Sequence, residues 1–157
     1  MVGGASLECF WPAAVGVRPR FSGPAMAYEL LVQAEFSAAH NLREYKGKCE
    51  RLHGHNWHVD LYLAGETLNQ EGMLLDFQEA KRILGQALEP FDHAYLNEVA
   101  PFDRLNPSSE NLARVVAQAV AAQLPPGVRV AAVTTWESDR CAATYRPDPA
   151  DAGRGEA

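Results

Sequence analysis

The sequence has few cysteines, a deficit of basic residues and no long hydrophobic run. No stretch approaches the roughly 18 apolar residues that a membrane-spanning helix needs. The three cysteines, Cys9, Cys49 and Cys141, are odd in number and far apart, which argues against a disulfide framework. We therefore expect a reducing compartment, the cytoplasm. The 20 acidic and 14 basic residues leave a net charge of -6, so the basic surface of a nucleic-acid-binding domain is not expected.

What is present is the composition of one folded domain. The 157 residues are 47% hydrophobic and 22% charged, which is typical of a globular chain with a substantial core. Residues 1–27 are broken by Gly and Pro and lack an amphipathic period, so we expect a disordered arm or an over-extended start that precedes a natural start at Met26. Residues 147–157 have the composition of a solvated tail. The folded domain is predicted to span residues 28–146.

The hydrophobic pattern of this domain predicts strands interleaved with two helices. Asp76 and Glu79 have the spacing of a helix N-terminal capping box, and Ser108 or Ser109 can cap the second helix. The two helices end near Pro90 and Pro125. Four segments have the composition and alternation of strands: 28–39, 53–64, 128–137 and 141–146. These elements indicate an α+β fold, an antiparallel sheet with two helices on one face.

Four of the five histidines lie between residues 40 and 58. On a strand, His53 and His55 share a face and can bind one ion, whereas His58 has the opposite parity and should face away. His40 ends the preceding predicted strand, and antiparallel pairing can bring it opposite the pair. Three histidines suit Zn²⁺ and leave a fourth position open, which is typical of a catalytic site. Two ordinary surface histidines remain the alternative for the His53–His55 pair taken alone.

Cys49 lies in the predicted loop before these histidines and allows two interpretations. As a fourth zinc ligand it would close a structural site. The nearby cations would instead favour a thiolate that acts as a base or nucleophile; they are Arg43, Lys46, Lys48 and Arg51. The same cations can attract a phosphorylated substrate, or they can be ordinary exposed loop charges.

Two further carboxylates are candidates for the site. Asp92 directly precedes His93 and can orient its imidazole as a proton carrier, although an Asp-His pair in a loop is also a common capping turn. Glu137 ends an otherwise apolar strand. It either faces solvent or is buried, where it can accept N–H donors from a heterocycle.

Taken together, six motifs resemble those of the 6-pyruvoyltetrahydropterin synthase family, in the same order. The spacing of three residues between Cys49 and His53 most resembles the bacterial queuosine-pathway branch, the 6-carboxytetrahydropterin synthases. The likeness covers most of residues 28–146, and its motifs are Phe36-Ser-Ala-Ala-His40, Cys49-x-x-x-His53-Gly-His55, Gly72-Met-Leu-Leu-Asp76-Phe77, Leu88-x-x-Phe-Asp92-His93-x-Tyr95-Leu96-Asn97, Asn106-Pro-Ser-Ser-Glu110-Asn111 and Trp136-Glu137.

The resemblance implies a T-fold with a four-stranded antiparallel sheet, assembled as a homohexamer of two stacked trimers with active sites between subunits. It implies zinc ligation by His40, His53 and His55. By the same likeness Cys49 is the proton acceptor, Asp92 and His93 belong to its relay, and Glu137 anchors the pterin ring and joins that relay. The implied reaction converts 7,8-dihydroneopterin triphosphate to 6-carboxy-5,6,7,8-tetrahydropterin, acetaldehyde and triphosphate.

Three hypotheses therefore differ in their consequences. The first is the lyase-type carboxytetrahydropterin synthase, and the second is a related enzyme that makes the 6-pyruvoyl product or serves another 7-deazapurine pathway. The third is a non-catalytic module in which Cys49 completes a closed zinc site. The presence of Asp92, His93 and Glu137 favours an enzyme, because a structural zinc site needs none of them.

Overall fold

A computed structural model of the protein describes residues 28–47 and 50–148. The expected N-terminal arm, nearly all of the expected tail, and Cys49 lie outside the described residues. The described elements follow one another as β1 (Tyr28–His40), β2 (His53–Gly65), α1 (Phe77–Leu88), β3 (Ala94–Tyr95), the short 3-10 helix η2 (Leu96–Glu98), α2 (Ser109–Ala121), β4 (Arg129–Ser138) and β5 (Cys141–Tyr145).

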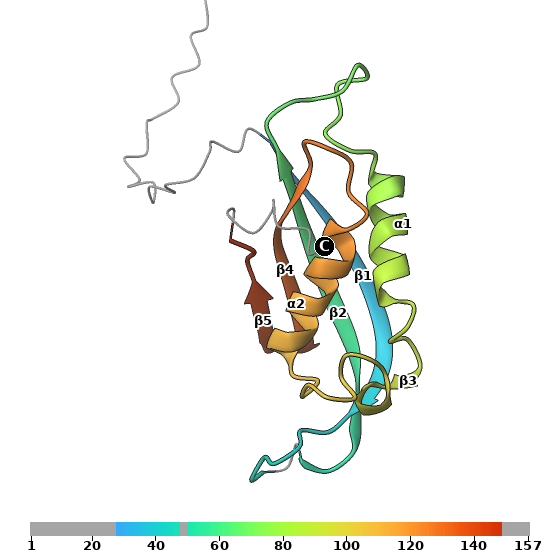
Figure 1. Ribbon diagram of the computed structural model, residues 1–157, viewed down its shortest axis with the longest axis vertical. Helices are drawn as coiled ribbons and strands as arrows, with labels where there is room; N and C mark the ends of the chain where they lie inside the picture. Colours follow the sequence, from blue (N-terminus) through green and yellow to red (C-terminus); the bar gives the residue numbers. More distant parts are fainter. Residues whose placement is uncertain (1–27, 48–49, 149–157) are drawn as a thin grey trace, which may run out of the picture.

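The strands form one sheet in the order β3-β1-β2-β4-β5, and both helices cover the same face of it (Figure 1). β1, β2, β4 and β5 pair antiparallel, as expected, which confirms the α+β T-fold arrangement. The structure adds β3, which pairs in parallel with Ala38 and Ala39 at the end of β1. A two-residue strand is too short to produce a hydrophobic period, so the sequence predicted four strands where the sheet has five.

Alternation along the strands separates a buried face from a polar one. Val32 and Phe36 of β1 and Trp57, Val59 and Leu61 of β2 point toward the helices and form the core of the protein. Phe36 and Trp57 lie directly opposite each other in the β1–β2 ladder, and their rings stack with centroids 6.1 Å apart. The other face of the sheet carries polar side chains.

The two helices begin at the residues that the capping signals indicate. The Asp76 side chain accepts a hydrogen bond from the Gln78 backbone N–H at 2.6 Å, and Ser108, rather than Ser109, caps α2. α1 packs along β1 and against α2, while α2 lies over β4 and β5. The buried helical side chains are Ala80, Ile83, Leu84, Ala87 and Leu88 of α1, and Leu112, Ala113, Val116, Ala117 and Val120 of α2. Over the described residues, no helix has the length and apolar character to cross a membrane.

Replacing the cap of α1 should weaken the fold by a predictable amount. Asp76→Ala removes the acceptor for the Gln78 N–H, so we expect the free energy of unfolding in urea to fall by about 1 kcal/mol. Asp76→Asn is the matched control, because its amide oxygen still caps the helix and should preserve most of the stability. An equal loss in both variants would show that the charge of Asp76, and not its cap, matters.

Candidate metal centre and active site

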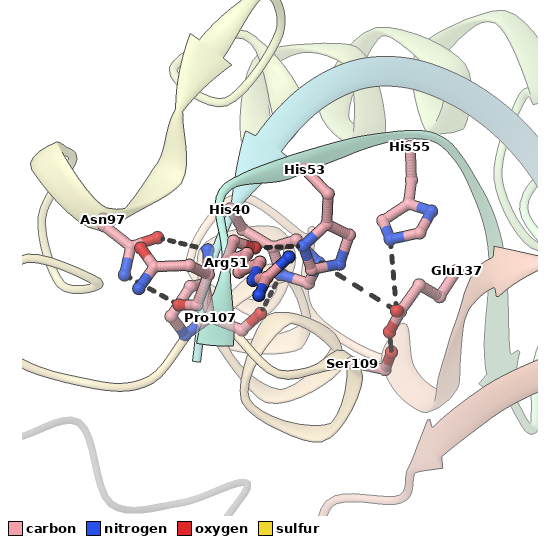
Figure 2. Close-up of polar contacts among 9 residues, drawn as sticks. His40, Arg51, His53, His55, Asn97, Pro107, Ser109 and Glu137 are labelled. Atoms are coloured by element: carbon pink, nitrogen blue, oxygen red, sulfur yellow. Dashed lines mark hydrogen bonds and ion pairs between the residues drawn. The ribbon is translucent and has the colours of Figure 1, made fainter. Parts of the chain in front are cut away.

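The pairing of β1 with β2 brings together the three histidines that the sequence selected. In this ladder His40 lies opposite His53, and Ala38 lies opposite His55. β4 adds Glu137, so that one ligand atom from each of the four side chains lies within 4.8 Å of the others. Figure 2 shows His53 and His55 reaching from β2 toward His40 and Glu137. The exposed fraction of the side chain is 1% for His40, 23% for His55 and 28% for Glu137.

Two backbone carbonyls set which nitrogens face the middle of this cluster. His40 Nδ1 lies 2.8 Å from the Pro107 carbonyl oxygen, and His53 Nδ1 lies 2.7 Å from that of Arg51. Because a carbonyl only accepts, each Nδ1 carries the proton and each Nε2 presents a lone pair when the ring is neutral. Backbone carbonyls are common partners for the outward nitrogen of metal-binding histidines.

The inward nitrogens are arranged in a way that a cation would explain. His40 Nε2 and His53 Nε2 lie 3.1 Å apart, and with both rings neutral there is no proton between them to share. His55 Nε2 is buried without a hydrogen-bond partner, although Glu137 Oε1 lies 3.2 Å away. Nitrogen ligands on a tetrahedral zinc ion at about 2.0 to 2.1 Å stand roughly 3.3 Å apart. The donor set therefore fits a zinc ion.

Burial keeps two of the histidines neutral. Burial lowers the pKa of His40, which outweighs the opposing effects of the Pro107 carbonyl and the Glu137 carboxylate. Burial also lowers the pKa of His55, again against the attraction of Glu137. A neutral imidazole is the form that binds metal, so the lowered pKa values favour metal binding by these two side chains.

Glu137 faces the histidine cluster, and the solvent-facing alternative is wrong for this side chain. Its Oε1 lies 3.2 Å from His55 Nε2, and the Ser109 hydroxyl donates to its Oε2 at 3.1 Å. Ser109 begins α2, whose N-terminus favours a negative charge. The α2 N-terminus is held to β4 because the Thr135 hydroxyl donates to the Ser109 carbonyl at 2.7 Å.

A hollow of about 280 Å³ opens beside Glu137. It lies between the N-terminus of α2 and the start of β5, so one wall offers hydroxyl groups and the other small side chains. Its volume is near the lower end of the range for small-molecule sites. The lining residues are Leu42, Ser108, Ser109, Glu110, Glu137, Cys141, Ala142 and Ala143.

Arg43 holds the loop that supplies the Pro107 carbonyl. Its guanidinium donates to the carbonyl oxygens of Asn97, Phe102 and Leu105 at 2.8 to 2.9 Å. The Arg43 backbone N–H also donates to the Asn106 side chain at 2.8 Å. Because the guanidinium is used in these bonds, Arg43 stabilises the fold. It is therefore neither an ordinary exposed loop charge nor a free group for binding phosphate.

Asp92 and His93 lie at the outer edge of β1, apart from the cluster. One oxygen of Asp92 accepts the Ser37 backbone N–H at 3.0 Å and lies 2.9 Å from His93 Nδ1, while the His93 N–H donates to the Ser37 carbonyl. The Ser37 N–H lowers the pKa of the Asp92 carboxyl. His93 has a φ of 56°, a left-handed backbone conformation, and its side chain is 82% exposed.

The pair and the cluster are separate groups within one chain. In the part of the chain that the structure describes, no hydrogen bond or ion pair joins Asp92 or His93 to the three histidines or Glu137. Asp92 lines a different hollow, of about 510 Å³, between α1 and the edge of β1. The Asp92 carboxylate contacts His93 Nδ1, the arrangement by which it can orient the imidazole.

Two residues that contact the cluster were not predicted from the sequence to do so. Pro107 contributes only a carbonyl, which no side-chain motif can signal, and Ser109 looked like a second candidate helix cap. His58 faces away from the cluster, as its parity predicted, and contacts Glu35 and Asp60 on the polar face.

Comparison with known proteins identifies the family. A family model described as 6-pyruvoyl tetrahydropterin synthase matches residues 29–148. The chain belongs to this family. A relative from Archaeoglobus fulgidus is 38% identical over 81 residues, which are 52% of this chain and 65% of that protein. The 6-carboxy-5,6,7,8-tetrahydropterin synthase of Synechocystis is 33% identical over 115 residues, 70% of this chain and 86% of the relative.

Members and relatives of the family carry more than one name. The dihydroneopterin monophosphate aldolase of Pyrococcus furiosus is 27% identical over 114 residues, 73% of this chain and 93% of the relative. Among solved structures, the 6-pyruvoyl tetrahydropterin synthase of Caenorhabditis elegans superposes with a TM-score of 0.69 at 27% identity. That match covers 77% of this chain and 96% of the other. This chain and the solved synthase structure share the fold of the pterin synthase family.

The lowered histidine pKa values predict how the metal-free protein responds to acid. A group whose pKa is lower in the folded state than in the unfolded state binds fewer protons when the protein is folded. Such a group leaves the protein at full stability above the unfolded pKa, and stability is lost as the pH falls toward the folded pKa. For His40 and His55 the unfolded pKa is 6.5. We expect the free energy of unfolding to fall as the pH decreases through 6.5 and below it. Urea titration of the chelator-treated protein at a series of pH values measures the free energy of unfolding. If this free energy depends on pH as steeply in His40→Gln as in the wild type, the assignment to His40 is contradicted.

Proposed function

We propose that this protein is a zinc-dependent 6-carboxy-5,6,7,8-tetrahydropterin synthase of queuosine or related 7-deazapurine biosynthesis, working in the cytoplasm. It converts 7,8-dihydroneopterin triphosphate to the carboxytetrahydropterin with release of acetaldehyde and triphosphate. The observation that carries the proposal is the convergence of His40, His53 and His55 beside Glu137, in a chain of the pterin synthase family. The Synechocystis relative, which bears this enzyme's name, supports the choice of product.

In this proposal each polar group has a separate task. His40, His53 and His55 would hold the zinc ion, which would supply Lewis acidity toward oxygen atoms of the substrate side chain and so lower the cost of removing a neighbouring proton. Cys49 takes that proton as a thiolate. His93, oriented through Nδ1 by Asp92, returns a proton from its exposed Nε2 side. Glu137 accepts N–H donors of the pterin ring in the hollow beside it and joins the relay.

The complete site is proposed to form between copies of the chain. Asp92 and His93 lie at the outer edge of β1, whereas Glu137 lies near β5 at the other side of the sheet. Over its described length, β1 pairs on its outer side only at Ala38 and Ala39. An open edge of this kind can pair with the β5 edge of another copy, and such head-to-tail pairing closes a ring. The family resemblance favours a trimeric ring and a homohexamer.

Product analysis tests the activity directly. Zinc-loaded protein is incubated with 7,8-dihydroneopterin triphosphate, and the products are identified by mass spectrometry. Carboxytetrahydropterin with acetaldehyde is the expected result. A pyruvoyl product would reassign the protein to the sister activity, and a cleaved side chain would favour the aldolase activity named for the Pyrococcus relative. Unchanged substrate with tightly held zinc would support the non-catalytic module instead.

Metal content separates a catalytic site from a closed structural site. Cys49→Ala should retain stoichiometric zinc and the fold but lose turnover, because in this proposal the thiolate is a base and not a ligand. His53→Ala should lose both zinc and activity. Zinc is measured by mass spectrometry of the metal after gel filtration, with circular dichroism as the folding control. Loss of zinc from Cys49→Ala would favour the closed four-ligand site.

Complementation tests whether two copies build one site. Cys49→Ala and His93→Ala are each expected to be inactive, but co-expression should restore up to about a quarter of the wild-type activity, since random assembly pairs an intact Cys49 with an intact His93 at that frequency. Co-expression of Cys49→Ala with His53→Ala is the control. Both of those residues come from one copy in this proposal, so their mixture should stay inactive. Activity in the control, or none in the first mixture, contradicts a shared site.

A further inference from the structure

On the polar face of the sheet, the Asp60 carboxylate is buried under three hydrogen bonds. Only 6% of Asp60 is exposed. Its Oδ1 accepts from Gln33 Nε2 at 2.7 Å and lies 3.0 Å from His58 Nε2, and its Oδ2 accepts from the Trp136 indole N–H at 2.8 Å. Gln33 belongs to β1, His58 to β2 and Trp136 to β4. One side chain therefore connects three adjacent strands.

These are the strands that supply the histidine cluster on the opposite face. β1 carries His40, β2 carries His53 and His55, and β4 carries Glu137. Trp136 directly precedes Glu137; the Trp136 indole contacts Asp60 on the polar face, whereas the Glu137 carboxylate lies with the histidine cluster. The indole anchored to Asp60 and the carboxylate beside the cluster thus extend from neighbouring positions of one backbone.

The backbone at Glu137 needs such an anchor because the sheet pairing changes there. The described β2–β4 ladder ends with His58 opposite Trp136. On the other side of β4, Trp136 lies opposite Ala142 and Ser138 lies opposite Cys141, so Glu137 is the extra residue of a β-bulge. A bulge redirects a side chain and leaves the extra residue without regular pairing. Trp136 is the last position at which both neighbouring strands hold β4 in register.

The charge of Asp60 suits this task. Burial raises the pKa of a carboxyl, but hydrogen bonds from Gln33, Trp136 and His58 outweigh it and leave the pKa of Asp60 below its usual value. The side chain therefore remains an ionised acceptor, and a hydrogen bond to a charged acceptor is stronger than one between neutral groups.

We propose that Asp60 is a positioning residue which, through the Trp136 indole, fixes the β-bulge of β4 and so directs the Glu137 carboxylate toward the pterin. The part of this inference that concerns the pterin rests on the proposed function. The part that concerns the bulge does not, because it follows from contacts within the chain.

Trp136→Phe removes the indole N–H and retains an aromatic ring. Its matched control is Thr134→Val, also on β4, which removes the hydrogen bond between the hydroxyls of Thr134 and of Thr144 on β5. We expect Trp136→Phe to bind neopterin, an unreactive analogue, roughly fivefold to tenfold more weakly, since a hydrogen bond to a charged group contributes at least that factor. Thr134→Val should leave the dissociation constant within about twofold. Zinc content should stay stoichiometric in both variants.

A double-mutant cycle shows whether the effect passes through Glu137. Glu137→Gln should also weaken neopterin binding, and adding Trp136→Phe should then cost little more, because the group that the indole positions is already altered. Independent, multiplicative losses would overturn the positioning role. Asp60→Asn keeps the shape of the side chain but loses the charged acceptor, so it should weaken neopterin binding in the same direction as Trp136→Phe; this variant tests the same link if Trp136→Phe does not fold.

Hydrogen exchange tests the role of Asp60 and Trp136 at the bulge without any pterin ligand. If Glu137→Gln leaves neopterin binding unchanged, the proposed role of Glu137 in substrate binding fails, but the bulge can still be examined. Backbone amides of residues 136–139 should exchange faster in Trp136→Phe than in wild type or Thr134→Val. Unchanged exchange at these residues would overturn the inference that Asp60 and Trp136 fix the bulge.

Discussion

The antiparallel register of β1 and β2 is the constraint on which the candidate site depends. It places His40 opposite His53 and puts His55 on the same face, two residues farther along β2. A shift of one residue would turn every side chain of one strand to the other face. The stacked Phe36 and Trp57 make that shift costly, because it would move large apolar rings out of the core. The same packing that stabilises the sheet therefore also aligns the histidines.

The second requirement is a set of groups that hold the rings and the carboxylate in place. The Pro107 and Arg51 carbonyls orient His40 and His53, and Ser109 contacts Glu137 from the start of α2. Arg43 ties down the loop before α2 through three carbonyls. Arg51 and Arg43 lie close to His53 and His40 in sequence, whereas Pro107 and Ser109 come from a segment far from the histidines. These contacts give the cluster of histidine nitrogens a fixed geometry, which a metal site of catalytic type requires.

The two faces of the sheet have different tasks in this molecule. One face carries the core and, at its end, the candidate metal centre. The other carries the Asp60 network, which connects the strands that supply that centre. Among the described residues, the Asp92–His93 pair at the sheet edge lies apart from the cluster, and the proposed shared site between copies would bring the two together.

The sequence by itself determined the fold class, the two long helices with their capping regions and the four long strands, because these follow from hydrophobic period, capping residues and turn signals. It also selected His40, His53 and His55, since strand parity and spacing are local properties. The tertiary structure alone decided which way Glu137 faces, which carbonyls orient the rings, and that Arg43 is used within the fold. It also revealed β3 and the bond between Asp60 and Trp136. Apart from the contact between Arg51 and His53, which are two positions apart, those features depend on contacts between residues 26 to 76 positions apart, which no local pattern encodes.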